Sequence, residues 1–203
     1  MARKKILVIG ANGFTGRRIL DDLSHNVFYQ TTGCSLHDDI CPHSGDYRFI
    51  RTDICNRQAV KKLFQEVQPD VVINTSALSV PDYCETHHEE AWLTNVTAVE
   101  QLAHLCESYK SRFIHLSTDF VFDGKIDEKS GQLYTEESLP APVNYYGFTK
   151  WKGEEKVAET CSSYAIVRVA IVYGRALPGQ HGNIVQLVMN RLKAGQEIRV
   201  VSD

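Results

Sequence analysis

The sequence predicts an α/β fold with a doubly wound parallel sheet, and three observations support this prediction. Short apolar runs without polar alternation recur along the 203 residues, as expected of strands that are buried on both faces. Stretches with helical periodicity separate these runs, so strands and helices alternate. A glycine-rich turn directly follows the first run. With right-handed crossovers, this pattern gives one parallel sheet covered by helices.

The composition narrows the classes of partner. Charged residues make up 23% of the chain and the formal net charge is −3, with no basic run, so we expect no nucleic-acid partner. No stretch approaches the roughly 18 apolar residues that span a bilayer, so we expect no membrane insertion. The six cysteines are scattered without a Cys-x-x-Cys pair, which favours a reducing cytoplasm over a zinc site or a disulfide framework.

The first predicted strand, residues 6–9, leads into three glycines spaced three residues apart, and a helix is predicted over residues 14–24. Gly10 permits a tight turn, Gly13 lets the backbone approach a phosphate, and Gly16 lets the helix pack on the strand. Free N–H groups and the helix dipole at the start of the helix suit a pyrophosphate. We therefore predict a dinucleotide site here, with a glycine-rich turn that binds nothing as the alternative.

The second strand, predicted over residues 27–32, bears on the choice of cofactor. An acidic side chain just after this strand would hold the ribose 2′-hydroxyl of NAD. The sequence Gly-Cys-Ser-Leu-His follows instead, and the first acid is Asp38. This favours NADP(H), with NAD(H) as the alternative. Ser35, His37 or Arg17 could bind the 2′-phosphate, although Arg17 could also be a solvated helix residue.

The next elements are a strand over residues 47–50 and a helix over residues 57–67. Between them, Asp53 either accepts a hydrogen bond from the adenine amino group or caps the helix, and Ile54 lies beside it. The strand over residues 71–73 ends in small residues that would let a cofactor pass close to the sheet edge; these include Ser76 and Ala77.

An acid-rich segment with two histidines precedes a helix predicted to run to residue 109. His87 and His88 are adjacent and cannot share a helix face, so we predict a helix start favoured by the dipole and no metal site. Within this helix Asn95 is a polar residue that is either a core amide or a group of the functional site.

The strand over residues 112–116 is followed by two hydroxyl residues at the same sheet edge. Thr118 or Ser117 could donate to a substrate carbonyl oxygen, or could simply cap the strand. Further on, Tyr146 and Lys150 are one helical turn apart. A nearby ammonium would lower the pKa of a phenol and make it a stronger proton donor, so we predict a catalytic pair, with an ordinary surface pair as the alternative.

The remaining sequence predicts a strand over residues 164–172, a helix over residues 183–194 and a strand over residues 198–201. Taken in order, the glycine turn, Asn74-x-Ser76-Ala77, Asn95, the Ser-Thr-Asp-Phe-Val-Phe-Asp-Gly string and Tyr146-x-x-x-Lys150 resemble an extended short-chain dehydrogenase/reductase. The Ser-Thr-Asp string and the Pro-Val-Asn-Tyr-Tyr-Gly-x-Thr-Lys stretch are similar to the dTDP-4-dehydrorhamnose reductase family.

This resemblance implies the roles of several residues. Thr118 and Tyr146 would bind the C4 carbonyl oxygen of a nucleotide-sugar substrate, with Tyr146 as the proton donor. Lys150 would hold the nicotinamide ribose and lower the pKa of Tyr146, and Asn95 would support Lys150. NADPH would deliver hydride, and the product would be dTDP-rhamnose. The implied cofactor contacts are Gly10, Asn12, Gly13, Phe14, Gly16, Arg17, Ser35, Asp53, Ile54, Ser76, Ala77, Tyr146 and Lys150.

The family resemblance also sets expectations for the extent of the chain. Members of the family continue well past the strand that matches residues 198–201, and the later residues help to build the sugar-nucleotide site, whereas this sequence stops at Asp203. We therefore expect residues 1–203 to form an NAD(P)-binding Rossmann domain with part of the substrate-binding region, and the substrate lobe to be largely absent. A homodimer is one assembly that we consider.

Two other functions stay open at this point. The stretch over residues 140–154 also resembles the methionine adenosyltransferase β subunit, a regulatory subunit that binds NADP without turnover. Sugar-nucleotide epimerases and dehydratases share much of the same plan and form the rival class of enzyme.

Overall fold

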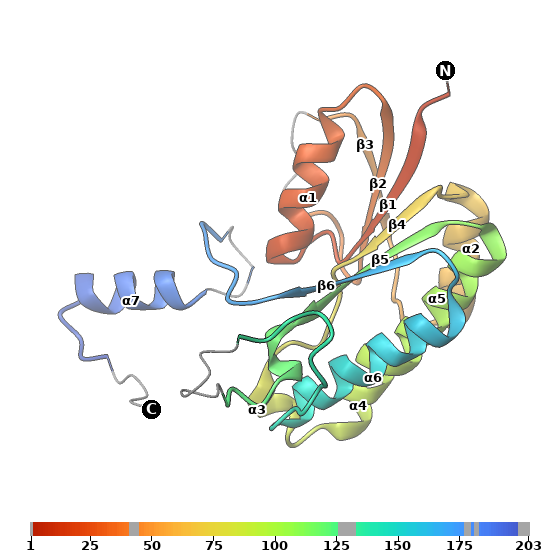
Figure 1. Ribbon diagram of the computed structural model, residues 1–203. Helices are drawn as coiled ribbons and strands as arrows, with labels where there is room; N and C mark the ends of the chain where they lie inside the picture. The colour runs from red at the N-terminus through yellow and green to blue at the C-terminus, as the bar shows by residue number, and fades with distance from the viewer. Residues whose placement is uncertain (1, 41–44, 126–132, 177–179, 181–182, 199–203) are drawn as a thin grey trace.

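A computed structural model describes residues 2–40, 45–125, 133–176, 180 and 183–198 (Figure 1). Its centre is a six-stranded sheet with the order β3-β2-β1-β4-β5-β6, in which every pairing is parallel. The predicted fold class is therefore confirmed. The strands are β1 Lys4–Ile9, β2 Tyr29–Ser35, β3 Tyr47–Arg51, β4 Val71–Asn74, β5 Arg112–Thr118 and β6 Tyr164–Val169.

The chain enters the sheet at its centre and winds outward in both directions. After β1 it moves through β2 to β3, and it then returns to the other side of β1 as β4. The neighbours β1 and β4 thus mark the point where the winding reverses. In open α/β sheets a ligand binds at this point, beyond the carboxyl ends of the strands.

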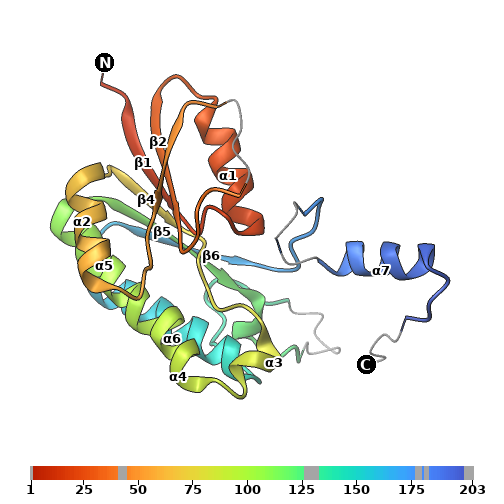
Figure 2. The same ribbon diagram turned by 180° about the vertical axis from the view of Figure 1, so that it is seen from behind.

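Helices cover both faces of the sheet, as Figures 1 and 2 show from opposite sides. Alternate residues of β1 point to opposite faces. Ile6 and Val8 belong to the core under α1, whereas Leu7 and Ile9 belong to the larger core under α2 and α5. The helical segments are α1 Phe14–Ser24, α2 Arg57–Val67, α3 Pro81–Cys84, α4 His88–Trp92, the π-helical turn η1 Leu93–Thr97, α5 Ala98–Tyr109, the 3-10 turn η2 Asp119–Val121, α6 Tyr145–Thr160 and α7 Ile184–Lys193.

The largest errors in the predicted strand boundaries fall in β2 and β6. The second strand starts at Tyr29 and runs to Ser35, because its parallel register with β1 begins where Tyr29 pairs with Lys4. Val27 and Phe28, which the prediction placed in the strand, are 75% and 74% exposed. The strand predicted over residues 164–172 ends at Val169, where its partner β5 also ends.

The last predicted strand, residues 198–201, is not part of the observed sheet at Ile198, and residues 199–201 lie outside the described residues. Helix α7 extends away from the sheet in both views and buries none of its residues (Figures 1 and 2). Among the helices that the structure describes, none combines the length and the apolar character needed to cross a membrane.

The helix predicted to run to residue 109 does so, from His88 to Tyr109, but it contains a π-helical turn between α4 and α5. The short α3 is separate from it, and the turn η1 contains the buried Asn95. A π-helical turn inside a helix is rare and needs a local cause. Two contacts supply it: the Asn95 amide holds the backbone of Leu78, and α6 lies so close that a Cβ atom at Gly153 would be 2.4 Å from the Asn95 carbonyl oxygen.

Candidate active site

The glycine-rich turn joins β1 to α1 and packs against the end of β4. Gly10 has a φ of +80°, and a Cβ atom there would lie 2.7 Å from the backbone nitrogen of Ser76, which Ala77 follows at the same edge. A Cβ atom at Gly16 would lie 2.2 Å from the Gly10 carbonyl oxygen. Gly13 is the N-cap of α1, and no side chain in the described part of the chain caps this helix. Its first N–H groups are therefore available to an anion.

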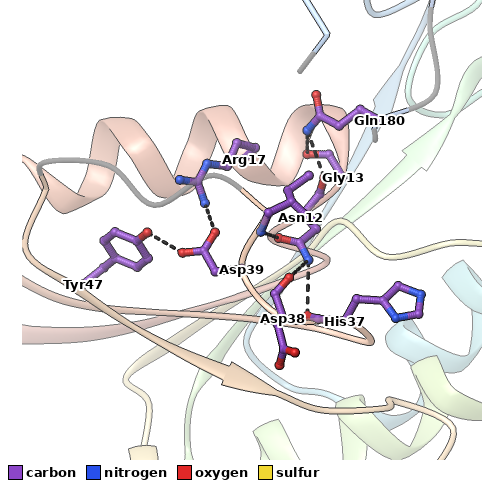
Figure 3. A network of polar contacts seen from close by, with 9 residues as sticks. Asn12, Gly13, Arg17, His37, Asp38, Asp39, Tyr47 and Gln180 are labelled. Atoms are coloured by element: carbon purple, nitrogen blue, oxygen red, sulfur yellow. Dashed lines mark hydrogen bonds and ion pairs between the residues drawn. The ribbon is translucent and has the colours of Figure 1, made fainter. Parts of the chain in front are cut away.

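Polar contacts link the glycine turn to two later segments (Figure 3). The side-chain amide of Asn12 donates to the carbonyl oxygens of His37 and Asp38, at 3.2 and 2.8 Å. The amide of Gln180 donates to the carbonyl oxygens of Asn12 and Gly13, at 2.9 and 3.2 Å. Asn12, a predicted cofactor contact, thus fixes the loop after β2 against the turn. Phe14 also contributes to this packing, because a Cβ atom at Gly174 would lie 3.1 Å from its ring.

Arg17 lies on α1 next to the loop after β2, and it is only 5% exposed, so the alternative of a solvated helix residue is wrong. Its Nη1 atom lies 2.8 Å from Oδ1 of Asp39, and the Tyr47 hydroxyl donates to the other carboxylate oxygen (Figure 3). Its Nη2 atom is buried and has no hydrogen-bond partner among the described residues. A buried donor without a partner is costly, and a phosphate oxygen would satisfy it.

The other predicted partners of the adenosine half lie nearby, with different degrees of exposure. Ser35 is half-buried at the end of β2, and His37 is exposed in the following loop. Asp53 is exposed and accepts from the backbone nitrogen of Cys55 at 2.9 Å. The alternative that Asp53 caps the next helix is wrong, because the side chain of Asn56 caps α2. Ile54, beside Asp53, packs against the larger core.

Thr118 is the last residue of β5 and is 5% exposed. Its hydroxyl donates to the Asp119 carboxylate at 3.1 Å and accepts from the Phe120 backbone nitrogen at 3.2 Å, so Thr118 does cap the turn η2. The neighbouring hydroxyl of Ser117 is buried without a hydrogen-bond partner among the described residues. Both predicted hydroxyl groups therefore lie at the carboxyl end of this strand.

Tyr146 is brought to Thr118 by the close approach of α6 and η2. A Cβ atom at Gly147 would lie 2.1 Å from the Phe120 carbonyl oxygen, and the Phe120 and Tyr146 rings meet edge to face with centroids 5.8 Å apart. Burial raises the pKa of Tyr146 to about 12, while the Thr118 hydroxyl acts in the opposite direction. The predicted lowering of the Tyr146 pKa is therefore wrong for this structure, because burial outweighs the favourable contact.

Lys150 is 2% exposed, so the Tyr146 and Lys150 pair is not an ordinary surface pair. Its Nζ atom donates to the Leu116 carbonyl oxygen at 2.7 Å and lies 3.3 Å from Nε2 of His115. Burial lowers the pKa of Lys150 to about 8, which the carboxylate of Glu154 partly offsets. Lys150 is thus buried beside β5, and two residues of this strand, His115 and Leu116, hold its Nζ atom.

Two side chains of the site, His115 and its neighbour Asn74, were not predicted from the sequence. Both side chains are fully buried, and Nδ2 of Asn74 lies 3.1 Å from Nδ1 of His115. Burial and the neighbouring Lys150 hold the pKa of His115 well below its usual range. One signal was present: a histidine in the middle of an otherwise apolar central strand has to find polar partners inside the protein.

Asn95 is a core amide in this structure. Its Oδ1 atom accepts from the Leu78 nitrogen at 2.9 Å, and its Nδ2 atom donates to the Leu78 carbonyl at 3.1 Å and the Thr149 hydroxyl at 3.0 Å. These contacts use both amide hydrogens. Asn95 thus holds α6 at Thr149, the residue before Lys150. Its support of Lys150 stays a prediction.

The acid-rich segment with two histidines has a structural explanation. The His87 ring stacks on Tyr83 with centroids 3.7 Å apart, and the His88 ring stacks on Tyr145 at 3.8 Å. Across the described ranges, no group of three or more His, Cys, Asp or Glu side chains is arranged to hold a metal ion.

A parallel sheet with a glycine turn at its reversal point, and a buried Tyr-x-x-x-Lys pair on the helix beside β5, define a protein of the extended short-chain dehydrogenase/reductase type. The family described as RmlD substrate binding domain matches residues 4–203. The chain belongs to this family.

Two relatives illustrate its range. The chain is 34% identical over 171 residues to methionine adenosyltransferase 2 subunit beta of Xenopus laevis. The aligned residues cover 84% of this chain and 48% of that protein. It is 34% identical over 208 residues to the probable low-salt glycan biosynthesis reductase Agl14 of Haloferax volcanii, with 97% and 63% covered. The chain thus spans about half the length of the first relative and under two thirds of the second.

Solved structures match the fold over nearly the whole chain. A dTDP-4-dehydrorhamnose reductase from Clostridium acetobutylicum has a TM-score of 0.82 and 33% identity, with 98% of this chain and 63% of that chain covered. The dTDP-4-dehydrorhamnose reductase of Bacillus anthracis, solved in complex with NADP, has a TM-score of 0.77 and 27% identity, with 97% and 62% covered.

Proposed function

We propose that this chain is the cofactor-binding part of an oxidoreductase that uses NADPH to reduce the C4 ketone of a nucleotide-activated deoxysugar, as in dTDP-4-dehydrorhamnose reduction. One observation carries the proposal: the Thr118 hydroxyl, at the carboxyl end of β5, is close enough to the Tyr146 phenol to act on its pKa. They share this sheet edge with the uncapped start of α1. A carbonyl oxygen between the two hydroxyls would be held where a nicotinamide can lie beside it.

The residues at the edge of the sheet fit a dinucleotide. The N–H groups at the start of α1 suit its pyrophosphate, and the partnerless Nη2 atom of Arg17 suits a 2′-phosphate, which favours NADP(H) over NAD(H). The Bacillus anthracis relative was solved with NADP. When bound, the cofactor supplies the hydride.

The protein's own residues would manage the proton and the position of the substrate. Tyr146, whose pKa is raised to about 12, carries its proton throughout the neutral range and would donate it to the oxygen that forms at C4. Thr118 would turn its hydroxyl from Asp119 to the same oxygen. Lys150 would favour the phenolate that Tyr146 leaves behind and hold the nicotinamide ribose. We place this reaction in the cytoplasm, with dTDP-rhamnose as its product.

A second candidate function is supported by the relatives. Methionine adenosyltransferase 2 subunit beta of several vertebrates is 30–34% identical to this chain. In that case the chain would bind NADP and a partner protein without turning over a sugar. The buried Tyr146 and Lys150 pair favours the reductase, because a scaffold has no need of a proton donor at this edge.

The test is NADPH oxidation on addition of dTDP-4-dehydrorhamnose, followed by absorbance, with this chain and with any longer form that its gene encodes. We expect consumption by the wild-type protein and consumption slowed by about 10²- to 10⁴-fold in Tyr146→Phe. NADPH binding without consumption, together with stable association with a methionine adenosyltransferase, would support the second candidate and contradict the first.

A further inference from the structure

Behind Lys150, buried polar groups form a hydrogen-bond chain that crosses from β4 through β5 to α6. It begins where the Ser76 backbone nitrogen donates to Oδ1 of Asn74 at 3.1 Å. It continues from Nδ2 of Asn74 to Nδ1 of His115 at 3.1 Å, and from Nε2 of His115 to Nζ of Lys150 at 3.3 Å. Asn74 and His115 are fully buried and Lys150 is 2% exposed, so water does not compete for these groups.

The donor-to-acceptor direction of this hydrogen-bond chain is fixed at its first side chain, Asn74. A backbone N–H can only donate, so the Asn74 oxygen faces Ser76, and the Ser76 hydroxyl donates to the same oxygen at 2.6 Å. The Asn74 amide nitrogen must then face His115, and it too can only donate. Nδ1 of His115 is therefore the acceptor, which assigns the proton of the neutral ring to Nε2.

The Nε2–H group of His115 points at Nζ of Lys150. An ammonium has only donors, whereas a neutral amine has one lone pair that can accept this hydrogen. The amine can still donate to the Leu116 carbonyl oxygen at 2.7 Å. The lowered pKa values of His115 and Lys150, both caused mainly by burial, agree with a neutral ring beside a neutral amine at pH values above about 8.

We propose that Asn74 and His115 are positioning residues whose hydrogen-bond chain favours the neutral amine form of Lys150 and sets the pH at which Lys150 takes up its proton. Uptake of that proton places two donors face to face, so the His115 contact must break when Lys150 becomes an ammonium. The role of this ammonium in binding cofactor rests on the proposed function. The direction of the hydrogen bonds from Asn74 through His115 to Lys150 does not.

Other charged groups act on Lys150 from the elements packed around it. One helical turn further along α6, Glu154 favours the ammonium, but Arg168 of β6 holds its carboxylate at 2.6 Å. Three more titratable groups lie on the phenol side of the site: Tyr146, Cys84 of α3 and Asp119 of η2. None of these groups is a member of the hydrogen-bond chain. A change at Asn74 therefore alters the hydrogen-bond chain and leaves these groups in place.

The first test reads the His115 tautomer directly. Long-range ¹H–¹⁵N spectra of the unmodified protein, recorded above pH 8, should show an unprotonated Nδ1 and a protonated Nε2. A proton on Nδ1, or a doubly protonated ring, would overturn the proposal. This measurement needs neither substrate nor turnover, so it can fail or succeed independently of the proposed reductase activity.

The second test reverses the direction of the hydrogen bonds by replacing the amide nitrogen of Asn74 with an oxygen. In Asn74→Asp, a carboxylate keeps the contact with Ser76 but accepts from Nδ1–H of His115, which turns the lone pair of Nε2 toward Lys150. We expect the pKa of Lys150 to rise by about one unit or more, a tenfold gain in proton affinity. The readout is the ¹³Cε resonance of labelled lysine, assigned by its loss in Lys150→Arg.

The matched control is Asn56→Asp. Asn56 also accepts from backbone N–H groups, but it is exposed at the cap of α2. This change should leave the His115 tautomer and the Lys150 titration as in the wild type. A Lys150 resonance that titrates with the surface lysines in the unmodified protein, or one that Asn74→Asp does not move, would contradict the proposal.

Discussion

The phenol of Tyr146 is the group on which the proposed proton transfer depends. Tyr146→Phe removes the hydroxyl and leaves the ring, which packs edge to face on Phe120. We expect turnover to fall by about 10²- to 10⁴-fold, the usual contribution of a general acid, while the affinity for NADPH stays nearly unchanged. Steady-state kinetics and a cofactor titration measure the two effects, and equal turnover in the variant would remove Tyr146 from the mechanism.

Lys150 also leaves a signature in stability. Its pKa is lowered to about 8 in the folded protein from 10.5, so between these values the unfolded chain binds more protons than the native one. Wild-type stability should therefore rise with pH over this window relative to Lys150→Met, and the advantage should disappear as the pH falls through about 8. Urea unfolding of both proteins across the window measures the difference, and a constant difference would show that Lys150 titrates normally.

The ion pair of Arg17 with Asp39 predicts a change in cofactor preference. Asp39→Asn removes a negative charge next to the guanidinium and leaves Arg17 to a 2′-phosphate. We expect the Kd for NADPH to fall severalfold while the Kd for NADH changes little. Asp38→Asn is the control, because Asp38 is exposed and lies near Arg51. An unchanged ratio of the two Kd values in Asp39→Asn would mean that Arg17 does not bind the 2′-phosphate.

At the scale of elements, the site exists because α6 approaches η2 without an intervening side chain. In Gly147→Ala the new Cβ atom would lie 2.1 Å from the Phe120 carbonyl oxygen, so α6 must move. We expect a loss of about 1 to 3 kcal/mol in the free energy of unfolding and a marked loss of turnover, because Tyr146 moves away from Thr118. Denaturant unfolding and kinetics measure both, with the exposed α6 variant Glu159→Ala as the control.

The elements were more predictable than their ends. Apolar runs and glycine spacing identified β1 and α1 from local pattern alone. The ends of β2 and β6 depend on the strands beside them, and single-segment periodicity does not contain that pairing. The π-helical turn at Asn95 was not predictable for the same reason, since its cause is the approach of α6 and the capture of the Leu78 backbone.

The catalytic side chains were predictable because they belong to short motifs, whereas their electrostatics were not. The sequence places Tyr146 and Lys150 one turn apart, but burial and not the neighbouring charge dominates the pKa of both. His115 was missed because a lone histidine in a strand acquires meaning only when its partners, Asn74 and Lys150, are known from the packed structure.

For the whole molecule, one parallel sheet collects residues from distant parts of the chain at a single edge. The glycine turn after β1, the end of β4 and the end of β5 all lie at the carboxyl ends of central strands, next to the reversal point. The alternation of strands and helices predicted this edge, because parallel strands expose the same end on the same side. The proposed ketone reduction rests on this arrangement, on the side chains of Thr118, Tyr146 and Lys150 at this edge, and on membership of the RmlD substrate binding domain family.

The most direct test of the proposed function is the fate of the hydride. The protein is supplied with NADPH stereospecifically deuterated at C4 of the nicotinamide, in two separate preparations, and with dTDP-4-dehydrorhamnose. Mass spectrometry and NMR of the sugar should locate one deuterium at C4 of the product from one of the two preparations. Deuterium that never enters the sugar, or a sugar that changes configuration without net loss of NADPH, would contradict the assignment as a reductase.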